Sequence, residues 1–539
     1  MLRLLVTLLL VVPIDAFGVS DSSARILATL PAPVLAGATE SAAPYESPTR
    51  ATSSHPIDAV VFAQLDRLGI EPARLCSDEV FVRRAFLDVI GTLPTVAETT
   101  QFLQDTASDK RSALVDRLLA REEFADYWTM KWSDLLRIKA EFPVNLWPNA
   151  AQAYHRWVRT AIRDNWPYDR FARELLTANG SNFRVGPVNF YRALPSREPA
   201  SIARAVALTF MGTRAEQWPP YQLDAMAMCF RYVGYKATGE WKEEIVFFDP
   251  TLFPATGRAA TAFPDKMFAL LTPERDPREV FADWLITPQN PWFTRAIANR
   301  VWSWLLGRGI VHEPDDLRPD NPPSNPELLA LLERELVAAR YDLKRLMRLI
   351  LNSHVYQLSS IARSAHPAAA ANFASYSLRR LEAEVLIDAL NQITSTTENY
   401  TSAIPEPFTF IPPDQRAIAL PDGSITSSFL EMFGRPARDT GLECERNNTI
   451  AASQRLHLLN STHVQRKLEQ GPGLQALLRA RGDPREKVDA LYLTFLSRHP
   501  TAQEQRLAAD YAAASPDKRA AALDLAWALL NSAEFLHRH

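Results

Sequence analysis

The sequence predicts a mainly α-helical protein, close to all-α, with two helical domains joined by a short bridge that contains β-structure. Three observations favour this fold class. Apolar residues recur at helical spacing along most of the chain. Glycine is scarce, at 18 residues in 539, well under the average usage of roughly 7 %. A chain of 539 residues also exceeds the size of one ordinary core, so two or three domains are expected.

Residues 1–18 have the pattern of a secretory signal peptide. Arg3 precedes an apolar run from Leu4 to Val12, and small residues precede a candidate cleavage point after Gly18. The run is too short to span a membrane, and no later segment approaches the roughly 18 apolar residues that a spanning helix needs. We therefore expect an exported chain (periplasmic, at the cell surface or secreted) with no transmembrane span after cleavage. The alternative is an uncleaved N-terminal anchor.

Residues 19–55 are rich in Ala, Ser, Thr and Pro, and we expect a disordered linker there. The first helical domain is expected over 56–215. Ser77 is a plausible N-cap that is followed by two acids, and Thr95 with Glu98 three residues later forms a capping box. The aromatic stripe that follows is expected to belong to the core.

Residues 216–262 have a different composition and form the expected bridge. The segment "EWKEEIVFFDPTLFP" is β-prone and ends in proline, which predicts a short strand. The second helical domain is expected over 263–539, with a long loop at 397–448, and loops of such length are usually functional or disordered. Its helices are expected at 265–271, 277–286, 291–306, 326–339, 342–353, 376–395, 449–468, 484–497, 502–512 and 517–535.

The composition argues against several classes of protein. Lys+Arg 59 against Asp+Glu 62 gives a net charge of −3, which offers no electrostatic footprint for nucleic acid. The three cysteines, Cys76, Cys229 and Cys444, allow at most one disulfide, and at least two are expected to be buried thiols. Nucleotide-binding, zinc-protease and serine-hydrolase motifs are absent, and the ten histidines show no zinc-ligand spacing. We expect no cofactor and no metal.

The first candidate site lies in the stretch "NRVWSWLLGRGIVHEPDDLRPDNPPSNP", which begins at Asn299. One histidine and three carboxylates crowd together there, and clustered oxygens suit hard cations. The alternative is a helix end followed by a solvated acidic turn. Arg308 stands between two glycines, a placement that can aim a guanidinium from an unusual backbone conformation. The crowded residues are His312, Glu313, Asp315 and Asp316.

The second candidate is "FGRPARDTGLECERNN", which starts at Phe433. Arginines alternate there with carboxylates, which suits either an anionic or sugar-like ligand or an ion-pair network that pins a long loop. These residues are Arg435, Arg438, Asp439, Glu443, Glu445 and Arg446. In a third segment, Arg379 and Arg380 stand three and four residues before glutamates, the spacing of helix-surface pairs.

Several of these motifs together resemble the paired domains of unknown function found in exported planctomycete and acidobacterial proteins, a cytochrome-associated surface-protein family. The first domain is similar through "FVRRAFLDVIGTLPT" and "NFYRALPSREPASIARAVALTFMGTR". The second is similar through "RAIANRVWSWLLGRGIVHEPDDL" and "GRPARDTGLECERN". The resemblance covers nearly everything from 56 to 539, and it implies a family rather than a reaction.

This chain departs from the family pattern where a prosthetic group would be held. Many relatives carry a C-x-x-C-H-x-H-P segment after "F-x-G", which is Phe210 to Gly212 here. This chain continues "TRAEQWPPYQLDAMAMCF", with no cysteine before Cys229 and no histidine, so covalent haem is not expected there. Relatives typically have histidine where this chain has Asn325 and Met347.

The most direct functional interpretation is therefore a non-haem binding or scaffolding protein for a partner protein or an extracellular polysaccharide. The alternative is a metal-independent hydrolase of glycan or peptide that uses Glu443 or Glu445, with Arg300, Arg308 and Arg446 brought close by folding. The candidate binding residues are Arg300, Arg308, Asp316, Arg435, Arg438, Glu443, Glu445 and Arg446.

Overall fold

The computed structural model describes residues 44–254, 271–480 and 482–539. It is about 54 % helical with 5 % strand, which confirms the mainly α-helical class. The expected signal peptide and nearly all of the helix expected at 265–271 lie outside the described residues. In the described ranges, no helix combines the length and apolar character needed to cross a membrane.

The helices before the bridge begin largely where the sequence places their caps. The Ser77 side chain accepts a hydrogen bond from the backbone of Val80, and the capping box of Thr95 and Glu98 is formed. These helices are α2 (Pro56–Leu68), α3 (Asp78–Ile90), α4 (Val96–Gln104), α5 (Lys110–Leu119), α6 (Glu122–Leu135), α7 (Pro148–Arg163), α8 (Tyr168–Leu176), α9 (Pro199–Val206) and α10 (Pro220–Ala227). A π-helical turn, Ala207–Met211, extends α9.

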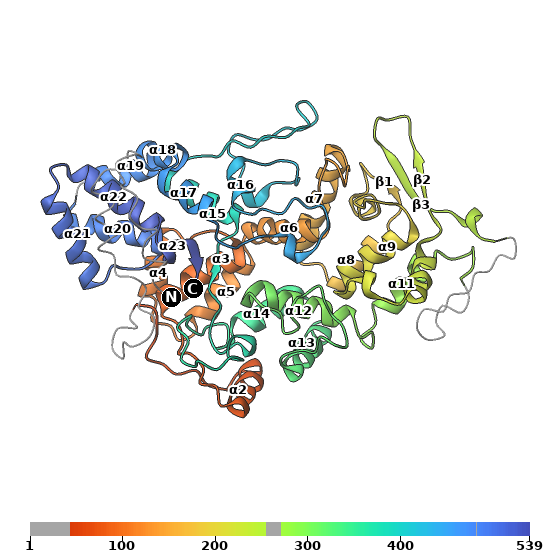
Figure 1. The fold of residues 1–539 in the computed structure, drawn as a ribbon, viewed down its shortest axis with the longest axis horizontal. Coiled ribbons are helices and arrows are strands. Elements are labelled where there is room, and N and C mark those ends of the chain that lie inside the picture. Colours follow the sequence, from red (N-terminus) through yellow and green to blue (C-terminus); the bar gives the residue numbers. More distant parts are fainter. Residues whose placement is uncertain (1–43, 255–270, 481) are drawn as a thin grey trace, which may run out of the picture.

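A small antiparallel sheet stands at one end of the molecule (Figure 1). Its order is β1–β3–β2, and Tyr235 lies opposite Val246, which is buried. The strand expected from the proline-bounded segment is therefore present. The strands are β1 (Gly180–Ser181), β2 (Val233–Ala237) and β3 (Glu244–Phe248).

The helices after the bridge match most of the expected ranges. α12 ends at Gly307, which has a φ of 82°, a value that favours glycine. They are α11 (Pro277–Leu285), α12 (Phe293–Leu306), α13 (Pro326–Ala338), α14 (Leu343–Leu351), α15 (Ala383–Thr394), α16 (Ser428–Met432), α17 (Ala452–Asn460), α18 (Thr462–Gln470), α19 (Pro472–Arg479), α20 (Pro484–Leu496), α21 (Ala502–Ala514), α22 (Lys518–Leu530) and α23 (Ala533–Leu536).

The helix expected at 376–395 is wrong over its first turns. Arg379–Arg380 form strand β4, which pairs with β5 (His537–Arg538), and α15 begins only at Ala383. The predicted helix-surface pairs of Arg379 and Arg380 are therefore absent. Arg379 instead forms an ion pair with the buried Asp88 of α3, at 3.2 Å.

Arg538 lies at the centre of a buried ion-pair network, which we call the Arg538 network. It is within 2.9 Å of Asp88 in α3 and 2.5 Å of Glu382, just before α15. Glu382 also pairs with Lys131 of α6, at 2.5 Å. Burial opposes the charge of Glu382, but the cations around it hold its pKa well below the usual value. The members of the network are Asp88, Lys131, Arg379, Glu382 and Arg538.

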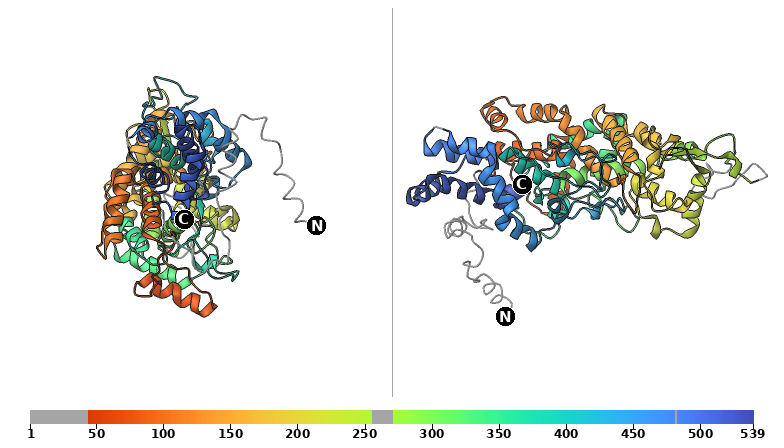
Figure 2. Two further views of the ribbon diagram at one scale, coloured as in Figure 1. Left: turned by 90° about the vertical axis from the view of Figure 1, so that its left-hand side faces the viewer. Right: turned by 90° about the horizontal axis from the view of Figure 1, so that it is seen from above.

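The buried apolar side chains form one continuous core that includes residues from both sides of the bridge. The molecule is elongated, with α20–α22 at one end and the small sheet at the other (Figures 1 and 2). The division at 216–262 into two domains stays a prediction. Residues 44–55 of the expected linker are described, and the buried carboxylate of Glu46 pairs there with Arg363 at 2.8 Å.

Candidate binding site

The first candidate stretch is built around Arg300, which is fully buried in α12. Its guanidinium donates to the carbonyl oxygens of Leu208 and Thr209, at 3.1 and 2.9 Å, and to Asp315 Oδ1 at 2.8 Å. The other oxygen of Asp315 accepts a hydrogen bond from the backbone N–H of Glu443, at 2.6 Å. Arg300 and Asp315 therefore connect the π-helical turn to the long loop.

The histidine and carboxylates after α12 do not converge. Each carboxylate faces a different guanidinium: Glu313 that of Arg214, Asp315 that of Arg300, and Asp316 that of Arg318 at 2.9 Å. Within the described ranges, no group of three or more His, Cys, Asp or Glu side chains could hold a metal ion.

Arg308 is half-buried, and its Nε has no hydrogen-bond partner among the described residues. With burial, its positive charge lowers the pKa of the nearby His312. Arg308 is not among the residues that line the small hollow beside Glu443, and neither is Arg300.

The arginines of the second candidate are engaged with carboxylates of neighbouring helices. Arg446 binds Asp134 of α6 at 2.6 Å and Glu384 of α15 at 2.7 Å. Arg438 binds the same Asp134 at 2.9 Å, and Arg435 lies 3.4 Å from Glu384. These contacts are those expected for ion pairs that attach a long loop to the helical body.

Glu384 shows the strength of this attachment. The residue is fully buried, which disfavours its charge, yet the guanidiniums of Arg446 and Arg435 lower its pKa to about 2. Glu445 has a local role, since it accepts hydrogen bonds from the backbone N–H groups of Asp439 and Thr440, at 2.8 and 3.2 Å. Its carboxylate therefore fixes a turn within the loop.

Glu443 is a candidate carboxylate whose surroundings disfavour its charge. Burial of its carboxyl group raises its pKa, and the negative charge of Asp315 adds to this effect. Glu443 Oε2 accepts a hydrogen bond from Trp304 Nε1 at 3.2 Å. Glu443 and Arg446 line a small hollow. The centre of a water-sized sphere can occupy about 10 Å³ of it, which is room for one water molecule.

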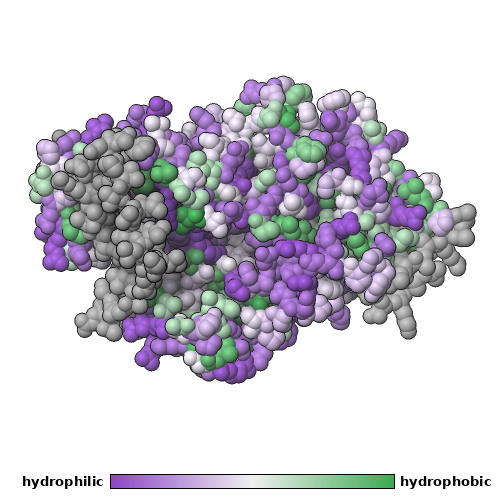
Figure 3. Space-filling model, viewed as in Figure 1, coloured by the Kyte–Doolittle hydropathy of each residue, from purple (hydrophilic) through white to green (hydrophobic). Residues whose placement is uncertain are grey.

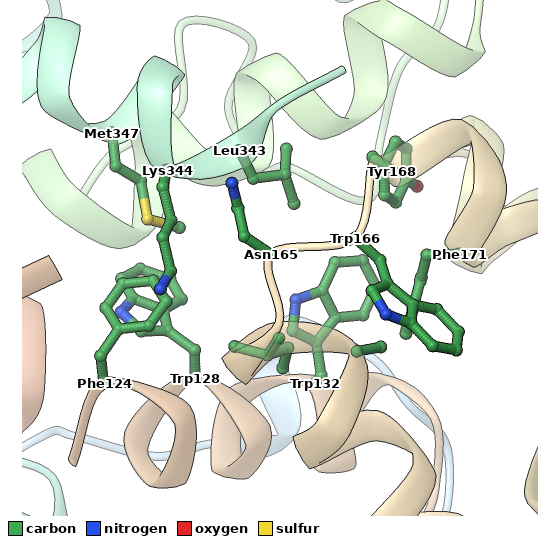
Figure 4. A pocket seen from close by; sticks show the side chains of 12 residues that line it. Phe124, Trp128, Trp132, Asn165, Trp166, Tyr168, Phe171, Leu343, Lys344 and Met347 are labelled. Carbon is green, nitrogen blue, oxygen red and sulfur yellow. The ribbon is translucent and has the colours of Figure 1, made fainter. Parts of the chain in front are cut away.

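An aromatic cavity lies between α6, α8 and α14 (Figure 4). Its volume by the same measure is about 40 Å³, too small for a drug-sized ligand. Lys344 Nζ lies 4.6 Å from the centre of the Phe124 ring, and burial lowers the pKa of this lysine. The cavity is lined by Phe124, Trp128, Trp132, Ala161, Ile162, Asn165, Trp166, Tyr168, Phe171, Leu343, Lys344 and Met347.

A larger hollow lies between α7 and the long loop, and we call it the α7 hollow. The space that the centre of a water-sized sphere can occupy in it is about 270 Å³. This volume is close to the lower end of the range for ordinary ligand sites. One wall comes from α7 and the other from residues 410–425. The lining residues are Gln152, His155, Arg156, Phe410, Ile411, Pro412, Gln415, Leu420, Pro421 and Ile425.

The α7 wall is polar and has free hydrogen-bonding capacity. His155 is only 6 % exposed, and its Nε2 has no hydrogen-bond partner among the described residues. Burial, with the positive charges of nearby arginines, lowers its pKa to about 3, so the imidazole is neutral. The side chain of Gln152 makes no hydrogen bond within the part of the chain that the structure describes.

The loop wall is apolar and carries exposed rings. Phe410 is 64 % exposed, and the neighbouring Phe408 packs its ring against Trp147 at 5.2 Å between centroids. Figure 3 shows apolar side chains among hydrophilic ones along the upper edge of the molecule, where the loop projects in Figure 1. Exposed aromatic rings beside polar groups are common at binding surfaces.

Sequence reasoning missed the α7 hollow and its functional groups. One signal was present, because Gln152, His155 and Arg156 stand at i, i+3 and i+4 and so share one face of a helix. The opposite wall lies more than two hundred positions further along the chain, and no local pattern places it there.

The comparisons with known proteins return domains without an assigned activity. A model described as PSCyt2, protein of unknown function (DUF1549), matches residues 56–216. A model described as PSD1, protein of unknown function (DUF1553), matches residues 277–512. No curated protein and no solved structure matches the chain. The chain thus matches two models of domains of unknown function in succession, PSCyt2 and then PSD1.

Proposed function

We propose that this protein is an exported, non-haem binding protein that holds a segment of an extracellular polysaccharide in the α7 hollow. The observation that carries the proposal is the hollow itself, with neutral, unpartnered His155 on one wall and the exposed ring of Phe410 on the other. Flat rings suit the apolar face of a sugar, and amide and imidazole groups suit its hydroxyls.

The residues proposed from the sequence have a supporting role in this account. Arg435, Arg438 and Arg446 hold the long loop against α6 and α15, and the loop supplies one wall of the hollow. The groups that contact the ligand are then Gln152, His155, Arg156 and Phe410. A partner protein remains the second kind of ligand that the test below includes.

Affinity electrophoresis of the full chain in gels that contain different polysaccharides tests the proposal. We expect at least one polysaccharide to retard the protein. Phe410→Ala should weaken that binding about tenfold or more, since an aromatic side chain that becomes covered by its ligand contributes much of a binding energy. Phe142→Ala is the control, because Phe142 is 84 % exposed but does not line the hollow. Absence of retardation by any polysaccharide, together with capture of a specific protein, would contradict the proposal.

The hydrolase alternative has one specific observation in its favour, the raised pKa of Glu443 beside a water-sized hollow. As a binding protein, the wild-type chain is expected to release no reducing ends from any polysaccharide that it binds. If it does release them, Glu443→Gln should lower the rate at least 100-fold. Glu313→Gln, which changes an exposed carboxylate paired with Arg214, should leave the rate unchanged.

A further inference from the structure

The charged group at the α7 hollow is a guanidinium with no carboxylate beside it. Arg156 is exposed on α7, and it has no ion-pair or hydrogen-bond partner among the described residues. The lining of the hollow includes neither aspartate nor glutamate. The arginines of the long loop differ from Arg156, because they are paired with buried or half-buried acids.

The surrounding charges leave Arg156 as the group available to a ligand. Arg159, one turn away on α7, is held by Asp126 at 2.6 Å and Glu122 at 3.1 Å. Asp422 is buried, and its Oδ1 accepts hydrogen bonds from the backbone N–H groups of Ala140 and Ser424. Asp414 is exposed in the loop but does not line the hollow.

We propose that the α7 hollow selects an acidic saccharide, whose carboxylate or sulfate group pairs with Arg156 while its ring packs against Phe410. The sugar hydroxyls then meet the amide of Gln152 and the imidazole of His155. This inference rests on the proposed function and adds the chemical class of the ligand. An anion beside an unpaired guanidinium gains charge-assisted hydrogen bonds that a neutral sugar cannot make.

The lining favours a saccharide over an acidic peptide. Peptides are commonly held along an exposed strand edge or in an apolar groove that accepts a helix. The α7 hollow instead joins a helix face with amide, imidazole and guanidinium groups to a loop. Gln415 donates its amide group to the carbonyl oxygens of Arg416 and Ala419, at 3.2 and 3.0 Å, so the loop wall is held by its own hydrogen bonds.

The experiment uses the full chain and three soluble polysaccharides: polygalacturonate, a sulfated carrageenan and neutral dextran. Poly-glutamate is the acidic peptide arm. We expect at least one acidic polysaccharide to bind at least tenfold more tightly than dextran, and salt to weaken that binding because the pair with Arg156 is exposed. Comparing polygalacturonate with the carrageenan shows whether the bound anionic group is a carboxylate or a sulfate.

Arg156→Gln is expected to reduce acidic binding at least tenfold while leaving the fold intact. Arg334→Gln is the matched control: it removes the same charge from an exposed arginine of α13, which lies on the opposite side of the molecule from α7 in Figure 1. Equal binding of dextran and the acidic chains would overturn the ligand class but keep the proposed function. Equal binding of poly-glutamate would overturn the saccharide assignment. An Arg156→Gln protein that binds like the wild type would overturn the role of Arg156.

Discussion

Replacing Arg538 with alanine is expected to lower the free energy of unfolding by about 3–5 kcal/mol, the usual cost of removing one partner from a buried ion pair. The guanidinium is 2 % exposed and pairs with both Asp88 and Glu382. It also donates to the Tyr127 hydroxyl at 3.1 Å. Such a loss is a large share of the 5–15 kcal/mol typical of native proteins. Chemical denaturation followed by tryptophan fluorescence measures it.

Two further variants make this prediction specific. Arg334→Ala, at an exposed position, should change stability by no more than about 0.5 kcal/mol. Arg538→Lys keeps one charge but loses the fork of donors, so its stability should lie between wild type and alanine. A loss below about 1 kcal/mol for Arg538→Ala would show that the network contributes little.

Glu384→Gln is expected to destabilise the protein by about 3 kcal/mol at pH 7. Its pKa is lowered from 4.5 to about 2 in the folded state, so the charged form stabilises the fold. This contribution, roughly 3 kcal/mol for such a displacement, is complete above the unfolded value of about 4.5 and is lost as the pH falls towards 2. The stability difference between wild type and Glu384→Gln should therefore shrink across that range.

Unfolding curves of the wild type and of Glu384→Gln at pH 7, 5, 4 and 3 test whether their stability difference shrinks at low pH. Glu327→Gln serves as the control, because Glu327 is exposed and pairs with the exposed Arg67 at 3.3 Å. Parallel pH profiles for wild type and Glu384→Gln would mean that the carboxyl group of Glu384 titrates normally in the fold.

Local chemistry accounts for the elements that the sequence predicted correctly. The Ser77 cap and the capping box at Thr95 depend on hydrogen bonds within three residues, so their signals stand side by side in the sequence. The wrong helix at 376–380 has the opposite cause. Arg379 and Arg380 fit a helix locally, but they pair with Arg538 and His537 as a strand, and that pairing is non-local.

The candidate site also combines features that local sequence predicts with contacts that are non-local. The alternation of arginines and carboxylates after Phe433 suggested an ion-pair network, but the sequence did not identify its acids. Asp134 stands 304 positions from Arg438, and Glu384 stands 62 from Arg446. The α7 hollow forms where a loop packs against α7, and the two segments are far apart in sequence. Periodicity in the sequence does not predict such a contact.

The placement of Arg538 bears on the order in which the chain can fold. The guanidinium of Arg538 donates a hydrogen bond to the carbonyl oxygen of Leu87, 451 positions away in sequence. The guanidinium of Arg84 donates one to a carbonyl oxygen of His539, 455 positions away. During synthesis from the N-terminus, α3 emerges long before Arg538 and His539. Its charged side chains therefore lack these native partners until the end of the chain has been made. Contacts of such high sequence separation slow folding and leave intermediates exposed to aggregation. α3 therefore cannot complete its native buried contacts until Arg538 and His539 have been synthesised.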